Sequence, residues 1–138
     1  RSYQPSLLIE SQSTIRHTAS GKAWKVEISG GKRTRYFPAQ LSLGKIAVNS
    51  GTLVTASVWL YRGNSLATLR LICPGGQIAG VTNDVSTDAS STGAWEQATI
   101  TFTPSESGVI ELFAQAFSSD LNTGTYTNYV DDFSITQA

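Results

Sequence analysis

Few residues of this chain have the types and spacing that catalysis needs. The single histidine, His17, lies in Ile15-Arg16-His17-Thr18, and no serine has the flanking residues of a nucleophile elbow. Four glutamates are candidates for the carboxylate pair of a small hydrolase: Glu27, Glu96, Glu106 and Glu111. Their spacing does not select any two of them. The sequence therefore predicts no catalytic site, and we expect a protein that is not an enzyme.

Cysteine and metal chemistry is limited as well. Cys73 is the only cysteine, so it cannot form a disulfide within the chain. One cysteine and one histidine do not make a thiolate or imidazole metal site of ordinary spacing. Because Cys73 ends the apolar run of residues 69–73, we expect it to be a small buried hydrophobe.

The charge balance indicates neutral partners. Ten basic and ten acidic residues give zero net charge, and no run of Lys or Arg is longer than Lys32-Arg33. A nucleic-acid binder carries a basic patch, so we expect no nucleic-acid partner. No stretch approaches the roughly 20 apolar residues that span a bilayer, so we expect no membrane insertion. The chain begins at Arg1 and contains no Met, which predicts a processed protein or a domain of a longer one.

Apolar and polar residues alternate along most of the chain, and this alternation predicts β-strands. The clearest stretches, separated by Gly, Pro, Asn and Ser, are residues 23–29, 53–61, 67–73, 95–102, 109–117 and 130–135. No stretch of comparable length repeats every 3.6 residues. The sequence therefore predicts an all-β fold, a jelly-roll β-sandwich of two antiparallel sheets, with residues 1–138 as one domain.

Two connections predict how strands pair. The short turn Arg62-Gly63-Asn64-Ser65 predicts a hairpin of residues 53–61 with residues 67–73. The last third of the chain, around the turn at residues 103–108, predicts three antiparallel strands.

The alternation also separates a core face from an opposite face. Trp59 and Tyr61 lie opposite Val58 and Leu60. In residues 109–117, four larger or polar side chains lie opposite the apolar face: Glu111, Phe113, Gln115 and Phe117. Asp131 shares its parity with Phe133 and Ile135, which predicts that its carboxylate points inward. A charge there is costly, so we expect a cation or several N–H donors beside it.

Several segments resemble the family 4/9 carbohydrate-binding modules. The C-terminal half carries the resemblance in Gly93-Ala94-Trp95, Phe102-Thr103-Pro104, Gly108-Val109-Ile110 and Tyr129-Val130-Asp131-Asp132-Phe133-Ser134-Ile135. Upstream, residues 20–26 resemble the early strand of the family and residues 51–61 resemble its central strand. That family folds as a galactose-binding-like jelly roll, and similar modules recur in glycosidases, adhesins and tailed-phage virion proteins.

The resemblance implies a sugar cleft on a concave sheet. Trp59 and Tyr61 would be aromatic platforms for the C–H faces of sugar rings. The polar partners would be Arg70, Glu111 and Gln115, with Phe113 and Phe117 as further apolar wall. An alternative is that this face is packed, or that another subunit covers it.

The resemblance also implies a structural Ca²⁺ that ties the first strand to the last. Its ligands would be Glu10, Asp131 and backbone carbonyls near Gly21 and Lys22, and such oxygen ligands suit Ca²⁺. An alternative is that Asp131 is capped by backbone amides at a bulge.

These observations predict a non-catalytic module that binds a polysaccharide or cell-surface glycan. The alternative is a structural module of a virion or extracellular assembly, such as a capsid decoration or tail protein, in which the same fold contacts homo-oligomer or virion subunits. Either function predicts an extracellular or virion-surface location.

Overall fold

The computed structural model describes residues 6–12, 23–29, 39–64, 67–76, 84–117 and 125–137, with the backbone alone for residues 6–12, 27–29 and 125. The described residues form nine strands: β1 Ser6–Gln12, β2 Ala23–Ser29, β3 Ala39–Val48, β4 Val54–Arg62, β5 Thr68–Cys73, β6 Val85–Asp88, β7 Trp95–Phe102, β8 Gly108–Phe117 and β9 Thr125–Gln137. The six clearest stretches of alternation correspond to β2, β4, β5, β7, β8 and β9. Among these residues, no helix is long and apolar enough to cross a membrane.

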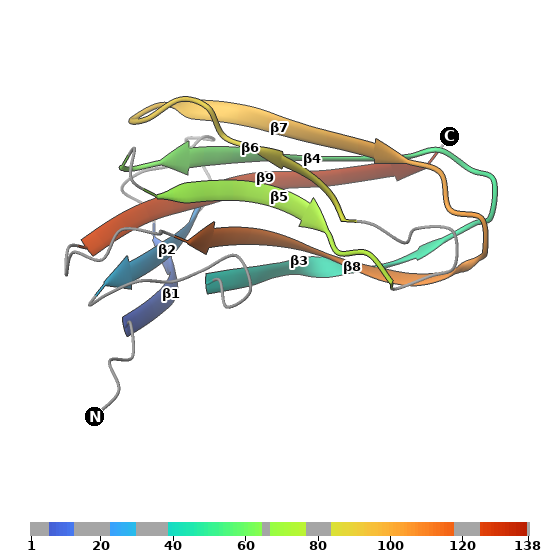
Figure 1. Cartoon of the computed structure of the whole chain (residues 1–138), viewed down its shortest axis with the longest axis horizontal. Coiled ribbons are helices and arrows are strands. Elements are labelled where there is room, and N and C mark those ends of the chain that lie inside the picture. Colours follow the sequence, from blue (N-terminus) through green and yellow to red (C-terminus); the bar gives the residue numbers. More distant parts are fainter. Residues whose placement is uncertain are drawn as a thin grey trace.

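The strands form two antiparallel sheets that lie one over the other (Figure 1). One sheet has five strands in the order β1-β2-β9-β4-β7, and the other has four in the order β3-β8-β5-β6. The predicted all-β jelly-roll sandwich is confirmed. The core lies between the sheets and contains alternate side chains of each central strand, such as Val58 and Leu60 of β4 and Ile110 and Leu112 of β8. Full burial of one such side chain is worth about 1.5–3 kcal/mol.

The predicted hairpin is wrong, whereas the three antiparallel strands predicted in the last third of the chain are present as β7, β8 and β9. β4 and β5 do not form a hairpin, because β4 pairs with β7 and β9 while β5 pairs with β6 and β8 in the other sheet. In the last third of the chain, β7 and β9 flank β4, and β8 lies in the four-stranded sheet. Each short connection therefore crosses from one sheet to the other instead of turning back within a sheet.

Two of these crossings are joined at one end of the sandwich. Gly51 N donates to Pro104 O at 2.8 Å. Ser50 Oγ donates to Ser105 O at 2.8 Å, and Ser50 N donates to Ser107 Oγ at 2.9 Å. The link from β3 to β4 thus supplies partners for the link from β7 to β8, which satisfies backbone groups that have left the sheets.

A β-bulge in β9 reverses the predicted direction of Asp131. Ser57 pairs with Ser134 and Trp59 with Asp131, so the β9 side of this interval contains one extra residue. Asp132 lies in the bulge with a φ of 51°, and its N–H donates to Asp131 Oδ1 at 2.8 Å. Asp131 consequently lies on the face of Trp59, away from the core side that contains Ile135. The inward carboxylate was a wrong prediction because the alternation was counted through the bulge.

Asn128 is a fully buried polar side chain that joins three strands. Its Nδ2 donates to Val26 O of β2 at 3.4 Å, and its Oδ1 accepts from Gly63 N, after β4, at 3.4 Å. Gly63 is needed here, because a Cβ at that position would lie 1.9 Å from Thr127 O. The Asn128 side chain of β9 therefore connects β2 to the end of β4, where the backbones of Gly63 and Thr127 lie close together.

The segment between β6 and β7 is held by one acid and one base. Glu96 accepts from Ser91 N at 2.8 Å and from Ser90 N at 2.9 Å. Arg62 donates to the carbonyl of Ser90 at 3.0 Å and to that of Ser91 at 3.3 Å. The hydrogen bond from the Ser91 N–H is the main reason that the pKa of Glu96 lies below its ordinary value of 4.5.

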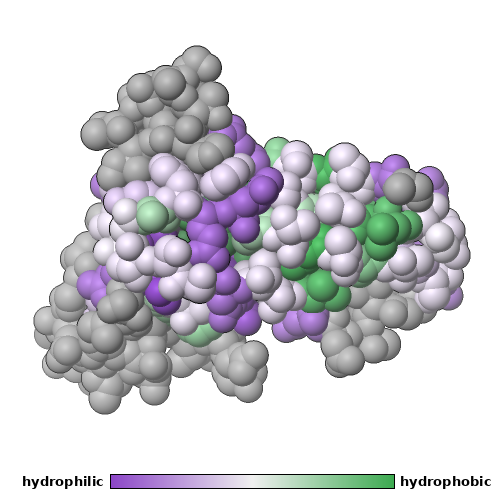
Figure 2. Space-filling view, turned by 90° about the horizontal axis from the view of Figure 1, so that it is seen from above, coloured by the Kyte–Doolittle hydropathy of each residue, from purple (hydrophilic) through white to green (hydrophobic). Residues whose placement is uncertain are grey.

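Seen from the β7 side, hydrophilic side chains form a band across the molecule (Figure 2).

Replacement of Asn128 by Ala should destabilise the fold. The change leaves the Gly63 N–H and the Val26 carbonyl without their side-chain partner, which costs about 1–2 kcal/mol. Urea unfolding should show a lower midpoint with little change in slope. Asn49→Ala, which removes an exposed amide, is the matched control, and an equal loss in both variants would contradict the role given to Asn128.

Replacement of Glu96 by Gln should lower the melting temperature at pH 7 but have little effect in acid. A carboxyl whose folded pKa is depressed stabilises the fold above its unfolded pKa, and that contribution is lost as the pH falls through the folded pKa. The difference from the wild type should therefore shrink as the pH falls below about 4.5. Glu106→Gln, at an exposed turn residue, should show no such pattern, and a pH-independent effect of Glu96→Gln would refute the explanation.

Candidate functional site

The structure separates the six predicted sugar-binding residues into two groups. Trp59 and Tyr61 lie on β4 of the five-stranded sheet. The other four lie on β5 and β8 of the four-stranded sheet: Arg70, Glu111, Phe113 and Gln115. Both groups point away from the core, so they lie on opposite outer surfaces of the sandwich. The single cleft that the resemblance implied is wrong for this set of residues, because β4 and β5 lie in different sheets.

We call these surfaces the four-strand face and the five-strand face. On the four-strand face, β8 presents a row in which polar side chains and rings alternate: Glu111, Phe113, Gln115 and Phe117. Both rings are half-buried. Phe113 lies opposite Ser42 of β3 on one side and Ile72 of β5 on the other. The row therefore follows the middle of the sheet and has neighbours on both flanks.

A hydrogen-bonded chain crosses this row. Nε and Nη2 of Arg70 both donate to Gln115 Oε1, at 3.0 and 2.9 Å. Gln115 Nε2 then donates to Gln40 Oε1 at 2.7 Å. Arg70 also lies over Phe117, with its Cζ 5.2 Å from the ring centroid, which is a cation–π geometry. Arg70 and Gln115 are buried, so they fix the orientation of Gln40, which is exposed.

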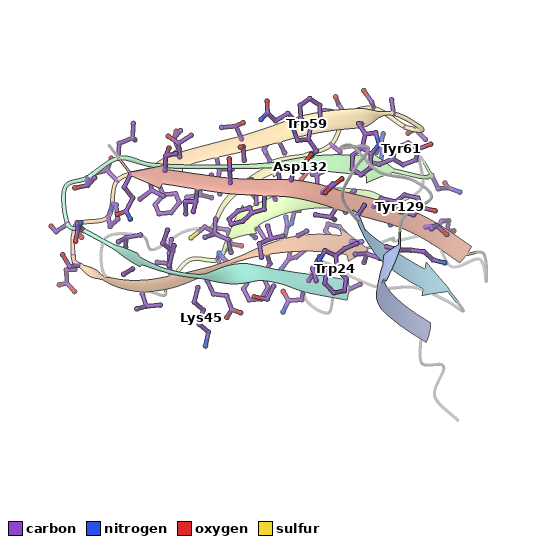
Figure 3. The ribbon with its side chains drawn as sticks, turned by 180° about the vertical axis from the view of Figure 1, so that it is seen from behind. Trp24, Lys45, Trp59, Tyr61, Tyr129 and Asp132 are labelled. Carbon is purple, nitrogen blue, oxygen red and sulfur yellow. The ribbon has the colours of Figure 1, made fainter. Side chains whose placement is uncertain are left out.

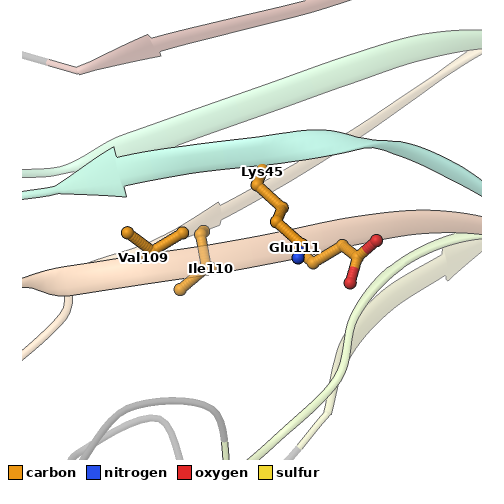
Figure 4. A pocket seen from close by; sticks show the side chains of 4 residues that line it. All are labelled: Lys45, Val109, Ile110 and Glu111. Atoms are coloured by element: carbon orange, nitrogen blue, oxygen red, sulfur yellow. The ribbon is translucent and has the colours of Figure 1, made fainter.

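One end of the four-strand face has a pocket lined by Lys45, Val109, Ile110 and Glu111 (Figure 4). Lys45 lies opposite Glu111 in the register of β3 and β8. Glu111 Oε2 accepts from Ser42 Oγ at 2.6 Å, which fixes the carboxylate beside the ring of the next outward residue, Phe113. This end thus offers an amine, a carboxylate and a hydroxyl.

The five-strand face carries an aromatic group. Tyr61 makes edge-on contacts with Trp95 of β7 and with Tyr129 of β9, each at 5.5 Å between ring centroids. Trp59 lies two residues before Tyr61 on the same strand and opposite Asp131. Figure 3 shows Trp59, Tyr61 and Tyr129 on this sheet, with Lys45 on β3 pointing away from them.

The predicted calcium ligands are only partly described. Lys22 lies outside the described residues, as does Gly21. Of Glu10 the backbone alone is described, and it pairs with Lys25, which in turn pairs with Tyr129 of β9. Asp131 is 8 % exposed. Among the described residues, no group of three or more His, Cys, Asp or Glu side chains is placed to hold a metal ion.

The residues with catalytic potential have other roles or are not described. His17 lies outside the described residues. Cys73 is fully buried, as predicted, and this burial together with the charge of Asp84 raises the pKa of its thiol to about 11. The neutral thiol is a poor nucleophile. Glu96 holds a loop and Glu111 is bonded to Ser42, so these two carboxylates have structural partners.

Four further residues belong to these faces but were not predicted: Gln40 and Ser42 on the four-strand face, and Trp95 and Tyr129 on the five-strand face. Trp95 and Tyr129 are more than 30 positions from Tyr61 and meet it only because β7 and β9 flank β4. Trp95 is the first residue of a clearly alternating stretch, so β7 was predictable from the sequence, but the pairing of Trp95 with Tyr61 was not.

The fold is shared with known carbohydrate-binding modules. No protein-family profile and no curated protein matches this chain. Among solved structures, TmCBM61 in complex with β-1,4-galactotriose is similar over 99 % of this chain and 88 % of its own, with a TM-score of 0.66 and 16 % identity. A CBM4 structure is similar over 84 % of both chains, with a TM-score of 0.56 and 20 % identity.

Part of a phage protein has the same fold as well. The enzymatically active domain of tailspike protein 4 from bacteriophage CBA120 is similar over 99 % of this chain but 19 % of its own, with a TM-score of 0.65 and 10 % identity. The fold-level part of the resemblance, a jelly roll like that of the carbohydrate-binding modules, is therefore confirmed.

Proposed function

We propose that this chain is a non-catalytic carbohydrate-binding module and that the four-strand face is its sugar site. The observation that carries the proposal is the outward row of β8, in which Glu111, Phe113, Gln115 and Phe117 alternate between polar groups and rings. A sugar also combines apolar and polar surfaces, because its ring has an apolar C–H face and an edge of hydroxyls. Half-buried rings and oriented polar groups suit both.

The hydrogen-bonded chain supports a binding role for this row. Arg70 has a neutral amide as its hydrogen-bond partner, and it orients Gln115 and through it Gln40. Groups that are already oriented lose less entropy when a ligand binds, which favours affinity. The likeness to TmCBM61, whose structure contains β-1,4-galactotriose, supports a glycan as the ligand class.

We further propose the structural Ca²⁺ that the resemblance implies, with Asp131, Glu10 and the Lys22 carbonyl as its ligands. Carboxylate and carbonyl oxygens are what Ca²⁺ prefers. Asp131 Oδ1 already accepts from the Asp132 N–H at the bulge, which is the backbone cap of the alternative, so the resemblance carries this proposal. The backbone register places Glu10 of β1 two strands from Tyr129 of β9, with Lys25 of β2 between them, and Asp131 follows Tyr129 by two positions. Homo-oligomers, virion subunits and an extracellular location stay predictions.

Replacement of Phe113 by Ala should weaken glycan binding several-fold, up to about tenfold. Full burial of such a ring is worth roughly 1.5–3 kcal/mol, Phe113 is already half-buried so that a ligand covers about half of that, and 1.4 kcal/mol is a factor of ten. Affinity gels that contain β-1,4-galactan or β-1,4-xylan measure the effect as retardation of the band. Gln115→Ala should also weaken binding because it releases Arg70 and Gln40.

Leu53→Ala is the matched control for Phe113→Ala. Leu53 is 44 % exposed and lies before β4 at the end of the sandwich, so its loss removes apolar surface without touching the β8 row. The control should bind like the wild type. Equal retardation of wild type and Phe113→Ala in a gel that retards the wild type would rule out the four-strand face as the site.

The calcium proposal has its own test in thermal unfolding. A ligand that binds the native state alone stabilises it by mass action, by about 2.7 kcal/mol at a hundredfold excess over Kd. EDTA should lower the melting temperature by several degrees, and added Ca²⁺ should restore it. Asp131→Asn should remove the response, whereas an unchanged melting curve of the wild type in EDTA would eliminate the site.

A further inference from the structure

The five-strand face has an aromatic group that the proposed sugar site does not use. It consists of Trp59, Tyr61, Trp95 and Tyr129, which we call the aromatic quartet. Tyr129, Tyr61 and Trp95 are successive partners across β9, β4 and β7, and all four side chains are half-buried. Rings on three adjacent strands of an outward face are not needed for the core, which is on the other side of the sheet.

Three rings of the quartet are held in place from two directions. Tyr61 lies edge-on between Trp95 and Tyr129 at 5.5 Å from each, a favourable arrangement of aromatic rings. Next to it, Glu96 and Arg62 fix the loop that leads into β7, and Gly93 N donates to Arg62 O at 2.8 Å. The rings therefore form an ordered surface rather than a set of independent side chains.

Beyond the rings, the part of the five-strand face on β4, β7 and the end of β9 is a hydroxyl surface. Two cross-strand rows continue from the quartet, Ser134–Ser57–Thr99 and Thr136–Thr55–Thr101. The Ser57 and Ser134 hydroxyls lie 3.0 Å apart. Gln97, which is exposed, lies opposite Trp59. This surface combines aromatic rings with neutral donors and acceptors. The charged neighbours of the rings have opposite signs, since Asp131 lies opposite Trp59 and Lys25 opposite Tyr129.

That combination identifies the class of ligand. A second copy of the chain or another protein would need a larger apolar area than the quartet supplies, since the rest of the face is Ser and Thr. A nucleic acid would need a cationic surface. A neutral saccharide matches both parts, because its C–H face stacks on rings while its hydroxyls meet hydroxyls and amides.

We propose that the five-strand face is a second glycan-binding site, with the aromatic quartet as its platform. Because this face points away from the four-strand face, one chain would hold two glycan strands on opposite sides. The inference shares its ligand class with the proposed function, but it depends on different residues and can fail independently of it.

Tryptophan fluorescence tests the second site separately. The chain has three tryptophans, and Trp24→Phe leaves Trp59 and Trp95, both in the quartet. In this background, titration with β-1,4-galactan and β-1,4-xylan oligosaccharides should change the emission. The change should persist when Phe113→Ala is added. It should be lost, or need at least tenfold more sugar, when Tyr61→Ala is added.

A second variant protects the test against misfolding. Tyr61→Ala removes the centre of the quartet, whereas Gln97→Arg adds bulk and charge at an exposed position beside Trp59 and leaves every ring in place. Gln97→Arg should also abolish the emission change, and thermal unfolding should confirm that the variant is folded. Retention of the full change in Gln97→Arg and Tyr61→Ala would overturn the proposal.

The outcomes separate the two sites. Unchanged emission at sugar concentrations that retard the protein in gels, with retardation lost in Phe113→Ala, would overturn the second site and leave the four-strand face as the sugar site. The absence of both signals would overturn both proposals. A wild-type dimer in sedimentation that becomes a monomer in Tyr61→Ala would assign this face to a second copy and overturn the proposal.

Discussion

Burial of one face of every central strand is the constraint on which this structure depends. An isolated sheet of these sequences would expose Val58 and Leu60 or Ile110 and Leu112 to water, so the two sheets stack and share one core. The same constraint sends the alternate side chains outward in opposite directions. The molecule therefore has two outer faces, one on each side of the common core, and each face is formed by its own set of side chains.

The chain reaches this arrangement by crossing between sheets at its short connections. Neighbours in sequence, such as β4 and β5, become members of different sheets, while β9 is inserted between β2 and β4. Hydrogen bonds between the links at one end of the sandwich, and the Asn128 amide on β9, stabilise these crossings. The positions of the site residues follow from this topology: Arg70 meets Gln115, and Tyr61 meets Trp95 and Tyr129.

The two faces differ in how their polar groups are organised. On the four-strand face, buried Arg70 and Gln115 form a fixed network among rings that alternate with polar side chains along one strand. On the five-strand face, rings from three strands cluster at one end and hydroxyls occupy the other. Binding on both sides would give a single small module two points of attachment, which raises avidity when the glycan is itself multivalent.

The alternation in the sequence was sufficient for the class of fold, for six of the strands and for the side of its own strand on which nearly every side chain lies. Trp59 is outward and Leu112 inward for local reasons, since the period of a strand is two residues. Only the tertiary structure decided which strands are neighbours, because pairing depends on contacts between residues far apart in sequence. It separated Trp59 and Tyr61 from Arg70 and Phe113, brought Trp95 and Tyr129 to Tyr61, and through the bulge at Asp132 turned Asp131 outward, where a count of alternating residues had placed it inside.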